Sequence, residues 1–480
     1  MSVGHSIIVN FIWRFFERFG ARLVSLVVSI VLARLLMPED YGLVALVSVF
    51  INILQVFVEN GIGTALVREK DADSIDFSTA FYFNIILSII LYLIIFISST
   101  YIADFYNNKK ITDLVRVLGL VVVIAAPKNI FESYIARNML FKKFFFATLT
   151  GTIGAAIVGI TMACYGFGVW ALVCQHLFNL TVDTIVLWFI AGWKPKKEFS
   201  LTKLKSLNSY SWKILLSVLI DKIYIELTSF IIGKKYTPSD LAFFNRGQHF
   251  PRLIAQNINS SLDSILLPAL ANVQDDTTKI KAMVKRSIKV GSYLMLPLMF
   301  GLAACAVPIV RILLTDKWLP CVPFIHVFCF AFVLYPIQTT NLNAIKALGK
   351  SELFLKLCLI QKSIGIIITI ITMNYSVKAM AYGFLLSLIL SLFINLFPNK
   401  KLLNYSLQEQ ILDFLPQFLL ALFMAITVFQ LSHLKYNDYI ILLIQSLTGS
   451  IIYICGSIIF KIDSLFYIIN LVKGFYKKNI

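Results

Sequence analysis

Three arginines near the N-terminus have the spacing of a single helical face. Arg14, Arg18 and Arg22 recur at i, i+4 and i+8 in the stretch FIWRFFERFGAR, which leads into a long apolar run. A charge near the middle of a bilayer costs about 2.5–3.5 kcal/mol on insertion scales, so three on one face need a polar cavity or an interfacial position. Arg14 and Arg18 could reach the headgroups with their long side chains. Arg22 lies about 25 Å of helix past His5, which favours a cavity.

A second polar stripe lies within residues 238–268. Its members recur at steps of four and three, so they share one helical face for about five turns. In lipid such a face must meet a water-filled cavity or other helices, and these groups exceed what ordinary interhelical hydrogen bonding requires. The stripe consists of Asn245, His249, Arg252, Gln256, Asn259 and Asp263, with Arg246 beside it.

Smaller groups of polar residues interrupt other apolar runs. Lys222 and Glu226, like Lys128 and Glu132, have the i,i+4 spacing of ordinary ion pairs, so a structural role stays open for them. A charge inside an apolar run marks a functional position by default. No catalytic or metal-binding residue is predicted. The predicted cavity lining comprises Arg14, Arg18, Arg22, Asn52, Glu59, Asp183, Asp221, Lys222, Asn245, Arg246, His249, Arg252, Gln256, Asn259 and Asp263.

The composition of the chain indicates a polytopic membrane protein. Of its 480 residues, 59% are hydrophobic and 14% are charged, whereas soluble chains carry about 25% charged residues. The net charge of +18 could suggest nucleic acid, but the basic residues stand in short loops beside apolar runs. That pattern points to membrane orientation and anionic lipid, with no nucleic-acid partner. The seven cysteines lack CxxC spacing, so neither disulfides nor zinc is expected.

Apolar runs predict about fourteen membrane-spanning helices. The runs are continuous rather than alternating, so helices rather than a barrel must satisfy the backbone. The N-terminus shows no cleavage site after a short apolar core, and it is interpreted as a retained first span. The spans cover residues 10–36, 41–65, 78–103, 112–136, 144–165, 168–192, 207–232, 238–268, 284–314, 320–345, 353–373, 376–397, 411–431 and 438–459.

Loop charges predict the orientation of these spans. Most loop lysines and arginines follow even-numbered spans, as do Arg137, Lys142 and Lys143, whereas few follow odd-numbered ones, such as Lys109 and Lys110. Both termini are therefore predicted to be cytoplasmic. The tail, residues 461–480, has lysines among apolar residues and is interpreted as an amphipathic segment on the inner surface; it could equally be frayed.

Two internal matches indicate a repeated architecture. LARLLMPEDYG, residues 32–42, aligns with IIGKKYTPSDLA, residues 231–242, at an offset of about 200 residues, and residues 126–143 align with 335–352. These matches predict a six-helix lobe over residues 1–200 and a second over 201–400. Residues 401–460 then add two spans, and the tail completes the chain.

The motifs that the chain lacks argue against an enzyme. It has no GxxxxGK[ST], HExxH, GxSxG or complete GxGxxG sequence, so nucleotide hydrolysis and protease or esterase chemistry have no support. The outer loops are about 5–12 residues long, too short for a separate catalytic domain. A transporter without a cofactor is predicted.

Several stretches resemble a known family. They include ARLLMPEDYGLVAL, FVENGIGTALVREKD, STAFYFN, GFGVWALV and FFNRGQHFPRLIAQNINSSLDSILLPALANVQDD. The chain resembles the Wzx-type polysaccharide and O-antigen flippases of the multidrug/oligosaccharidyl-lipid/polysaccharide superfamily, over the first twelve spans closely and the last two loosely. The chain departs from the lipid II exporters, whose cavity pattern does not map residue by residue onto this sequence, and the choice of glycan therefore stays open.

The resemblance implies a V-shaped pair of six-helix bundles around a cationic cavity in the bacterial inner membrane. It implies alternating access on undecaprenyl-diphosphate-linked oligosaccharide of O-antigen, capsule or exopolysaccharide, and polysaccharide polymerase or assembly proteins as partners. The first and eighth spans would flank a lateral opening to membrane lipid. The first span carries Arg14, Arg18 and Arg22, and the eighth carries Arg246 and Arg252.

Two other functions stay open. A drug or cation antiporter of the same superfamily would favour the carboxylates of Glu59, Asp183, Asp221 and Asp263 over arginines, and a membrane-embedded glycan polymerase or ligase is disfavoured by the short outer loops. The same carboxylates could take up H⁺ or Na⁺ and couple transport to a gradient, although downstream consumption of the product could also drive it.

Overall fold

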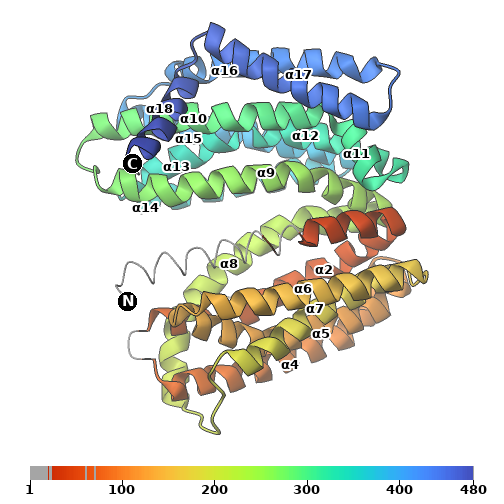
Figure 1. The fold of residues 1–480 in the computed structure, drawn as a ribbon. Coiled ribbons are helices and arrows are strands. Elements are labelled where there is room, and N and C mark those ends of the chain that lie inside the picture. The colour runs from red at the N-terminus through yellow and green to blue at the C-terminus, as the bar shows by residue number, and fades with distance from the viewer. Residues whose placement is uncertain (1–19, 21–23, 60–61, 70–71, 479–480) are drawn as a thin grey trace. The chain divides into compact units, whose positions relative to one another are not determined.

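The described part of the chain is built from helices joined by short loops (Figure 1). The computed structural model describes residues 20, 24–59, 62–69 and 72–478, and no β-strand occurs among them. The chain divides into two compact units, Met1–Ala242 (unit 1) and Phe243–Ile480 (unit 2). The predicted all-α class is confirmed. The finer division at residues 200 and 400 stays a prediction.

Unit 1 consists of helices that pack as neighbouring pairs. The pairs α4–α5 and α6–α7 make its most extensive contacts, and α2 packs on both α5 and α8. Its helices are α2 (Pro38–Glu59), α3 (Ile62–Arg68), α4 (Ser74–Phe105), α5 (Lys110–Arg137), α6 (Phe141–Cys164), α7 (Val169–Ile190) and α8 (Leu201–Lys235).

Unit 2 is centred on α10, which packs on α16, α13 and α12. Its first helix, α9, begins in unit 1 and continues into unit 2. The elements are α9 (Pro238–Ala271), α10 (Thr277–Ala304), α11 (Ala306–Leu314), η1 (Asp316–Cys321), α12 (Val322–Phe332), α13 (Tyr335–Ala347), α14 (Ser351–Thr372), α15 (Val377–Leu403), α16 (Leu407–Gln430), η2 (Leu431–His433), α17 (Asp438–Ile459) and α18 (Asp463–Lys478).

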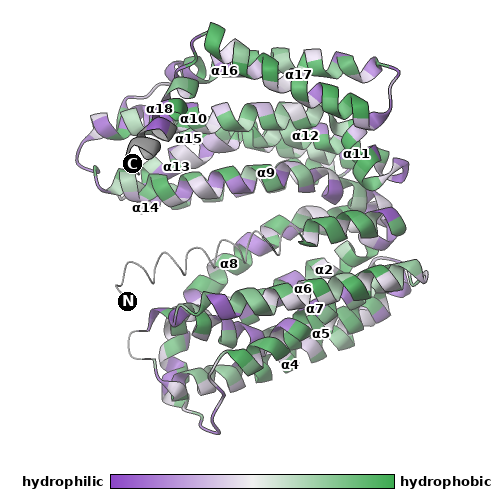
Figure 2. Ribbon diagram, in the orientation of Figure 1, coloured by the Kyte–Doolittle hydropathy of each residue, from purple (hydrophilic) through white to green (hydrophobic). Residues whose placement is uncertain are grey.

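Eleven segments of the described residues are long and apolar enough to cross a bilayer. They coincide with eleven of the predicted spans, and green apolar residues cover much of these helices (Figure 2). The chain is thus a multi-pass membrane protein. The other three predicted spans are 10–36, about half of which lies outside the described residues, and 207–232 and 238–268, which form the polar helices α8 and α9. The count of about fourteen spans stays a prediction.

Two predicted spans are interrupted rather than continuous. The span 284–314 forms α10 and α11, which meet at Cys305. The span 320–345 forms η1, α12 and α13; Pro323 and Pro336 stand in the first turns of α12 and α13. Proline donates no backbone N–H, so a hydrogen bond to the preceding turn is missing at each of these positions, and a new helix begins there. The described residues of the span 41–65 belong to α2 and α3, and residues 60–61 between them lie outside the described residues.

The first internal match has a common structural basis. Pro38 and Pro238 are the first residues of α2 and α9. The carboxylate of Asp40 accepts the Met37 N–H at 3.1 Å, and Asp240 accepts the Thr237 N–H at 3.1 Å. Proline at the first helical position and a carboxylate that returns to the preceding backbone are typical of helix starts. The repeated P-x-D sequence therefore starts a helix in both copies.

The second internal match ends two helices in the same way. After α5, the Leu140 N–H donates to the Ile135 carbonyl at 3.0 Å, and after α13 the Lys350 N–H donates to the Ile345 carbonyl at 3.2 Å. Both bonds belong to the C-terminal motif in which one left-handed residue closes the helix. That residue is Met139 in the first copy, with φ +54°, and Gly349 in the second, with φ +70°.

Polar contacts fix the loop between α7 and α8. Its Lys196 N–H donates to Ser78 Oγ at 3.0 Å. The Lys203 ammonium lies 2.7 Å from Asp73 Oδ1, and this hydrogen bond holds the pKa of the Asp73 carboxyl well below its usual range. These bonds secure α8 to the start of α4 and so place the polar residues of α8 within unit 1.

The predicted tail forms a helix, α18, over Asp463–Lys478. It packs on α10. Its Phe466 and Ile469 side chains are exposed, whereas Ser464 is buried. The helix is therefore amphipathic in character, and its location on the inner membrane surface stays a prediction.

Candidate functional site

A buried charged cluster joins α5 and α7 in unit 1. Lys128 Nζ lies 3.0 Å from Asp183 Oδ2 and 3.6 Å from Glu132 Oε1. Asp183 is only 4% exposed. Gly151 on α6 makes room for it, because a Cβ at that position would stand 1.9 Å from Asp183 Oδ1. Lys128 and Glu132 form the ion pair that their i,i+4 spacing suggests. Lys128 lies closer to Asp183, however, which belongs to another helix.

Glu59 lies at the end of α2 beside this cluster. Its carbonyl accepts the Asn129 Nδ2–H at 2.8 Å, which ties α2 to α5. Its carboxylate is within electrostatic range of Glu132, Lys128 and Lys222. Glu59 therefore stands between the cluster on α5 and a second polar group on α8.

The second polar group of unit 1 joins α8 to α2. Lys222 Nζ lies 3.2 Å from Glu226 Oε1, as the i,i+4 spacing predicts. Asn52 Nδ2 donates to the same Glu226 oxygen at 2.9 Å. Asp221, the neighbouring predicted site residue, is exposed. Two lysines and four carboxylates (Lys128, Lys222, Glu59, Glu132, Asp183 and Glu226) thus form the polar region of α2, α5, α7 and α8, with an excess of negative charge when all are ionised.

The polar stripe of unit 2 lies on α9, where polar residues alternate with apolar ones along the helix (Figure 2). His249 and Gln256 are exposed, and Asn245 and Arg252 are half-buried. His249 lies within electrostatic range of both Arg246 and Arg252. These residues form a face with amide and imidazole groups around one accessible guanidinium.

Two members of the predicted set on α9 are buried. Arg246 is 8% exposed, and its guanidinium carbon lies 5.1 Å from the centre of the Trp318 ring. Such an arrangement gains cation–π energy and shields the charge from bulk solvent. Asn259 is also buried, and its Oδ1 has no hydrogen-bond partner among the described residues. Asp263 is exposed and accepts the Asn343 Nδ2–H at 2.5 Å.

A buried amide cluster in unit 2 is absent from the predicted set. Asn341 Nδ2 donates to Gln410 Oε1 at 3.0 Å, and Asn399 Nδ2 donates to Asn341 Oδ1 at 2.7 Å. Gln361 Nε2 donates to Asn395 Oδ1 at 2.5 Å. The i,i+4 spacing of Asn395 and Asn399 inside an apolar run is a signal that could have drawn attention to it.

The predicted arginine stripe of Arg14, Arg18 and Arg22 lies outside the described residues. The retention of the N-terminal span stays a prediction. The unit 1 residues Asn52, Glu59, Asp183 and Lys222 approach one another across helices. The predicted site residues of α9 lie along a single helix. Their role as a cavity lining stays a prediction.

The family comparison matches most of the chain. A polysaccharide biosynthesis protein family matches residues 31–323. The chain is 22% identical to the succinoglycan biosynthesis transport protein ExoT of Rhizobium meliloti, over 70% of this chain and 68% of that protein. It is 21% identical to the lipopolysaccharide biosynthesis protein WzxC of Escherichia coli, over 65% of this chain and 64% of that protein.

A third relative is the teichuronic acid biosynthesis protein TuaB of Bacillus subtilis, 23% identical over 62% of each chain. The alignments thus span about two thirds of these relatives' lengths. The predicted resemblance to polysaccharide transporters is confirmed, and with it the prediction of a transporter rather than an enzyme.

Solved structures share the fold. The lipid II flippase MurJ in an inward closed conformation matches with a TM-score of 0.77 and 17% identity, over 95% of this chain and all of that one. An inward-facing multidrug resistance transporter of the MATE family matches with a TM-score of 0.61 and 16% identity, over 80% of this chain and 94% of that one. At these identities the likeness shows the fold alone.

Proposed function

Because the chain belongs to the polysaccharide biosynthesis protein family, we propose that it is a flippase for lipid-linked saccharides. Its substrate is an undecaprenyl-diphosphate-linked oligosaccharide repeat unit of an O-antigen, capsule or exopolysaccharide. The protein carries this unit from the inner to the outer leaflet of the bacterial inner membrane by alternating access, with both of its own termini in the cytoplasm. The names of ExoT, WzxC and TuaB support a saccharide substrate.

The observation that carries the proposal is the polar face of α9. Exposed His249 and Gln256 flank half-buried Arg252 on a helix of a multi-pass membrane protein. Amide and imidazole groups hydrogen-bond sugar hydroxyls, and a guanidinium grips two phosphate oxygens at once. One helix thus presents the two kinds of groups that a glycan diphosphate needs.

The physics of the substrate explains why such a face is required. The charges of a diphosphate cannot enter hydrocarbon unpaired, because desolvation of an isolated charge costs many kcal/mol. Arginine replaces the lost hydration with directed hydrogen bonds. The polyprenyl tail needs no such help and stays in the lipid during transport.

The test of this function is a deletion strain that carries no redundant exporter. We expect the deletion to abolish the surface glycan and to leave unflipped repeat units on the inner leaflet, because synthesis of the lipid-linked unit does not depend on the flippase. A plasmid copy of the natural sequence should restore the glycan. Normal surface glycan in the deletion strain would contradict the proposal, and altered chain length without inner-leaflet accumulation would indicate a polymerase.

The carboxylate excess in unit 1 favours one second candidate, a drug or cation antiporter. Glu59 and Asp183 lie in a region where carboxylates outnumber lysines, and carboxylates can hold a cationic substrate or a coupling H⁺ or Na⁺. Cation efflux from proteoliposomes, without an effect on lipid-linked glycan, would favour the antiporter. Saccharide transport that requires a H⁺ or Na⁺ gradient would assign the same region to coupling.

A further inference from the structure

A pocket in unit 2 lies between α10 and the C-terminal helix α18. It has a volume of about 650 Å³. A smaller pocket of about 140 Å³ adjoins it, and Lys289, Asp463 and Ser464 line both. None of the predicted cavity residues lines either pocket. The pair is therefore distinct from the polar face of α9.

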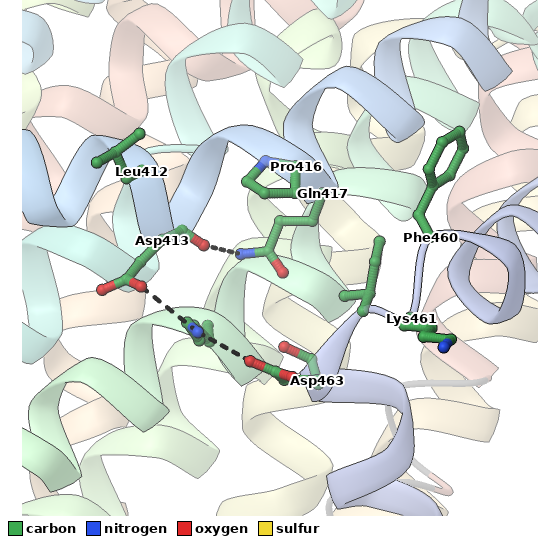
Figure 3. A pocket seen from close by; sticks show the side chains of 10 residues that line it. Leu412, Asp413, Pro416, Gln417, Phe460, Lys461 and Asp463 are labelled. Carbon is green, nitrogen blue, oxygen red and sulfur yellow. Dashed lines mark hydrogen bonds and ion pairs between the residues drawn. The ribbon is translucent and has the colours of Figure 1, made fainter.

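An ion-pair network lies where the two pockets meet. Lys289 Nζ lies 3.4 Å from Asp413 Oδ1 of α16 and 3.1 Å from Asp463 Oδ2 of α18. Lys285 Nζ also lies 3.2 Å from Asp413 Oδ1. Figure 3 shows Asp413 and Asp463 on opposite sides of this bridge. The network holds the start of α18 against α10 and α16.

Arg286 gives the larger pocket a cation outside this network. Its guanidinium carbon lies 4.0 Å from the centre of the Tyr467 ring, and the side chain is exposed. Among the described residues it has no carboxylate partner. A guanidinium stacked on a ring keeps its N–H groups directed outward, because stacking occupies only its face. Arg286 can therefore donate two parallel hydrogen bonds to an anion in the pocket.

The surroundings of the pocket combine positive charge with exposed apolar side chains. Lys285, Arg286 and Lys289 line it. Asp413 and Asp463 pair with the two lysines, so Arg286 supplies the positive charge that remains. Phe466 also lines the pocket and is partly exposed, as is Ile469 one turn further on. A phosphate beside apolar side chains on an amphipathic helix is the arrangement of a lipid headgroup.

We propose that this pocket binds the phosphate headgroup of an anionic phospholipid. Arg286 binds the phosphate, and the acyl chains extend along Phe466 and Ile469. Lipid bound there bridges α10 and α18 and adds to the hold of the Lys289–Asp463 pair. The site differs in residues and location from the proposed substrate path, so it does not depend on the proposed function.

The test is native mass spectrometry of the purified full chain with phosphatidylglycerol or phosphatidylcholine added in detergent. We expect selective retention of phosphatidylglycerol, and about tenfold weaker retention in Arg286→Ala, since a bidentate charge-assisted contact of this kind is lost. Arg286→Lys should keep part of the affinity. Lys473→Ala, which removes an exposed cation of α18 that does not line the pocket, is the matched control.

Each other outcome overturns the proposal in a defined way. Equal retention of the two lipids, or equal loss in Arg286→Ala and Lys473→Ala, would indicate a non-specific basic surface. Competition by millimolar inorganic phosphate that matches competition by a short-chain phosphatidylglycerol would indicate a free-anion site. Thermal unfolding in detergent without lipid checks that Arg286→Ala folds, and the Arg286→Lys result decides the question if it does not.

Discussion

Met139 and Gly349 occupy the same position in two equivalent helix ends, yet only one of them is a glycine. Both have left-handed backbone, with φ +54° and +70°. A side chain costs about 1 kcal/mol in this region. We therefore expect Met139→Gly to raise the free energy of unfolding by about 1 kcal/mol and Gly349→Met to lower it by a similar amount. Thermal unfolding of the purified protein in one detergent measures both changes.

The control for this pair is Met373, a methionine at a helix end with φ −62°. Met373→Gly should destabilise the protein, because glycine gains nothing there and adds entropy to the unfolded chain. If Met139→Gly were as destabilising as Met373→Gly, packing of the Met139 side chain would outweigh the backbone strain.

At the residue level, the sequence predicts which positions are unusual better than it predicts their partners. The spacing of Lys222 and Glu226 predicts their ion pair, and the structure shows it at 3.2 Å. The 3.0 Å contact of Lys128 with Asp183 joins residues 55 positions apart, so no local pattern could reveal it. Arg246 shares the α9 pattern, but its burial against Trp318 depends on the packing of η1.

Close approach of α6 and α7 depends on glycines of α6, among which Gly151 has the tightest surroundings. A Cβ at Gly151 would stand 1.9 Å from Asp183 Oδ1 and 3.0 Å from the Asn179 carbonyl. We expect Gly151→Ala to lower the free energy of unfolding by about 1–3 kcal/mol, because overpacking forces the helices apart. It should also reduce surface glycan, since it displaces Asp183 from Lys128. Thermal unfolding and complementation of the deletion strain are the two measurements.

Gly301 on α10 is the matched control, because a Cβ there would meet only Met424 Cε, at 4.0 Å. Gly301→Ala should be neutral or slightly stabilising, as alanine favours helix. Equal effects of the two substitutions would show that the close contact at Gly151 relaxes without cost.

At the element level, helix existence was predictable and helix interruptions were not. A bilayer requires about 20 apolar residues for each span, so long apolar runs leave few alternatives. The division of 320–345 into η1, α12 and α13 follows from Pro323 and Pro336, which the hydropathy pattern does not register. The start of α9 at Pro238 was predictable, because the sequence repeats the start of α2.

At the scale of the whole molecule, the two units carry different polar chemistry. Unit 1 gathers carboxylates and lysines in contact across helices, whereas α9 of unit 2 presents amides, imidazole and guanidinium along one helix. Composition and the internal matches predicted two lobes and a membrane transporter. They could not predict this division, because it depends on which helices meet within each unit.

The last prediction concerns which positive charges transport requires. Arg252 is half-buried on α9, so its charge is only partly hydrated, and removal should weaken substrate binding by about 2 kcal/mol, close to thirtyfold. We expect Arg252→Ala to reduce surface glycan strongly. Arg252→Lys should restore only part of it, because a point charge does not reproduce a bidentate contact. Surface glycan at matched membrane levels is the measurement.

Lys196 supplies the control for Arg252. Its side chain is exposed in a loop, and its backbone N–H donates to Ser78 Oγ. Orientation depends on loop charges collectively, so Lys196→Ala should be nearly silent. Arg22→Ala tests the N-terminal arginine stripe in the same assay and should resemble Arg252→Ala. Equal activity of Arg22→Ala, Arg252→Ala and Lys196→Ala would remove the arginine-based mechanism and leave the carboxylates of unit 1 as the groups that act on the substrate.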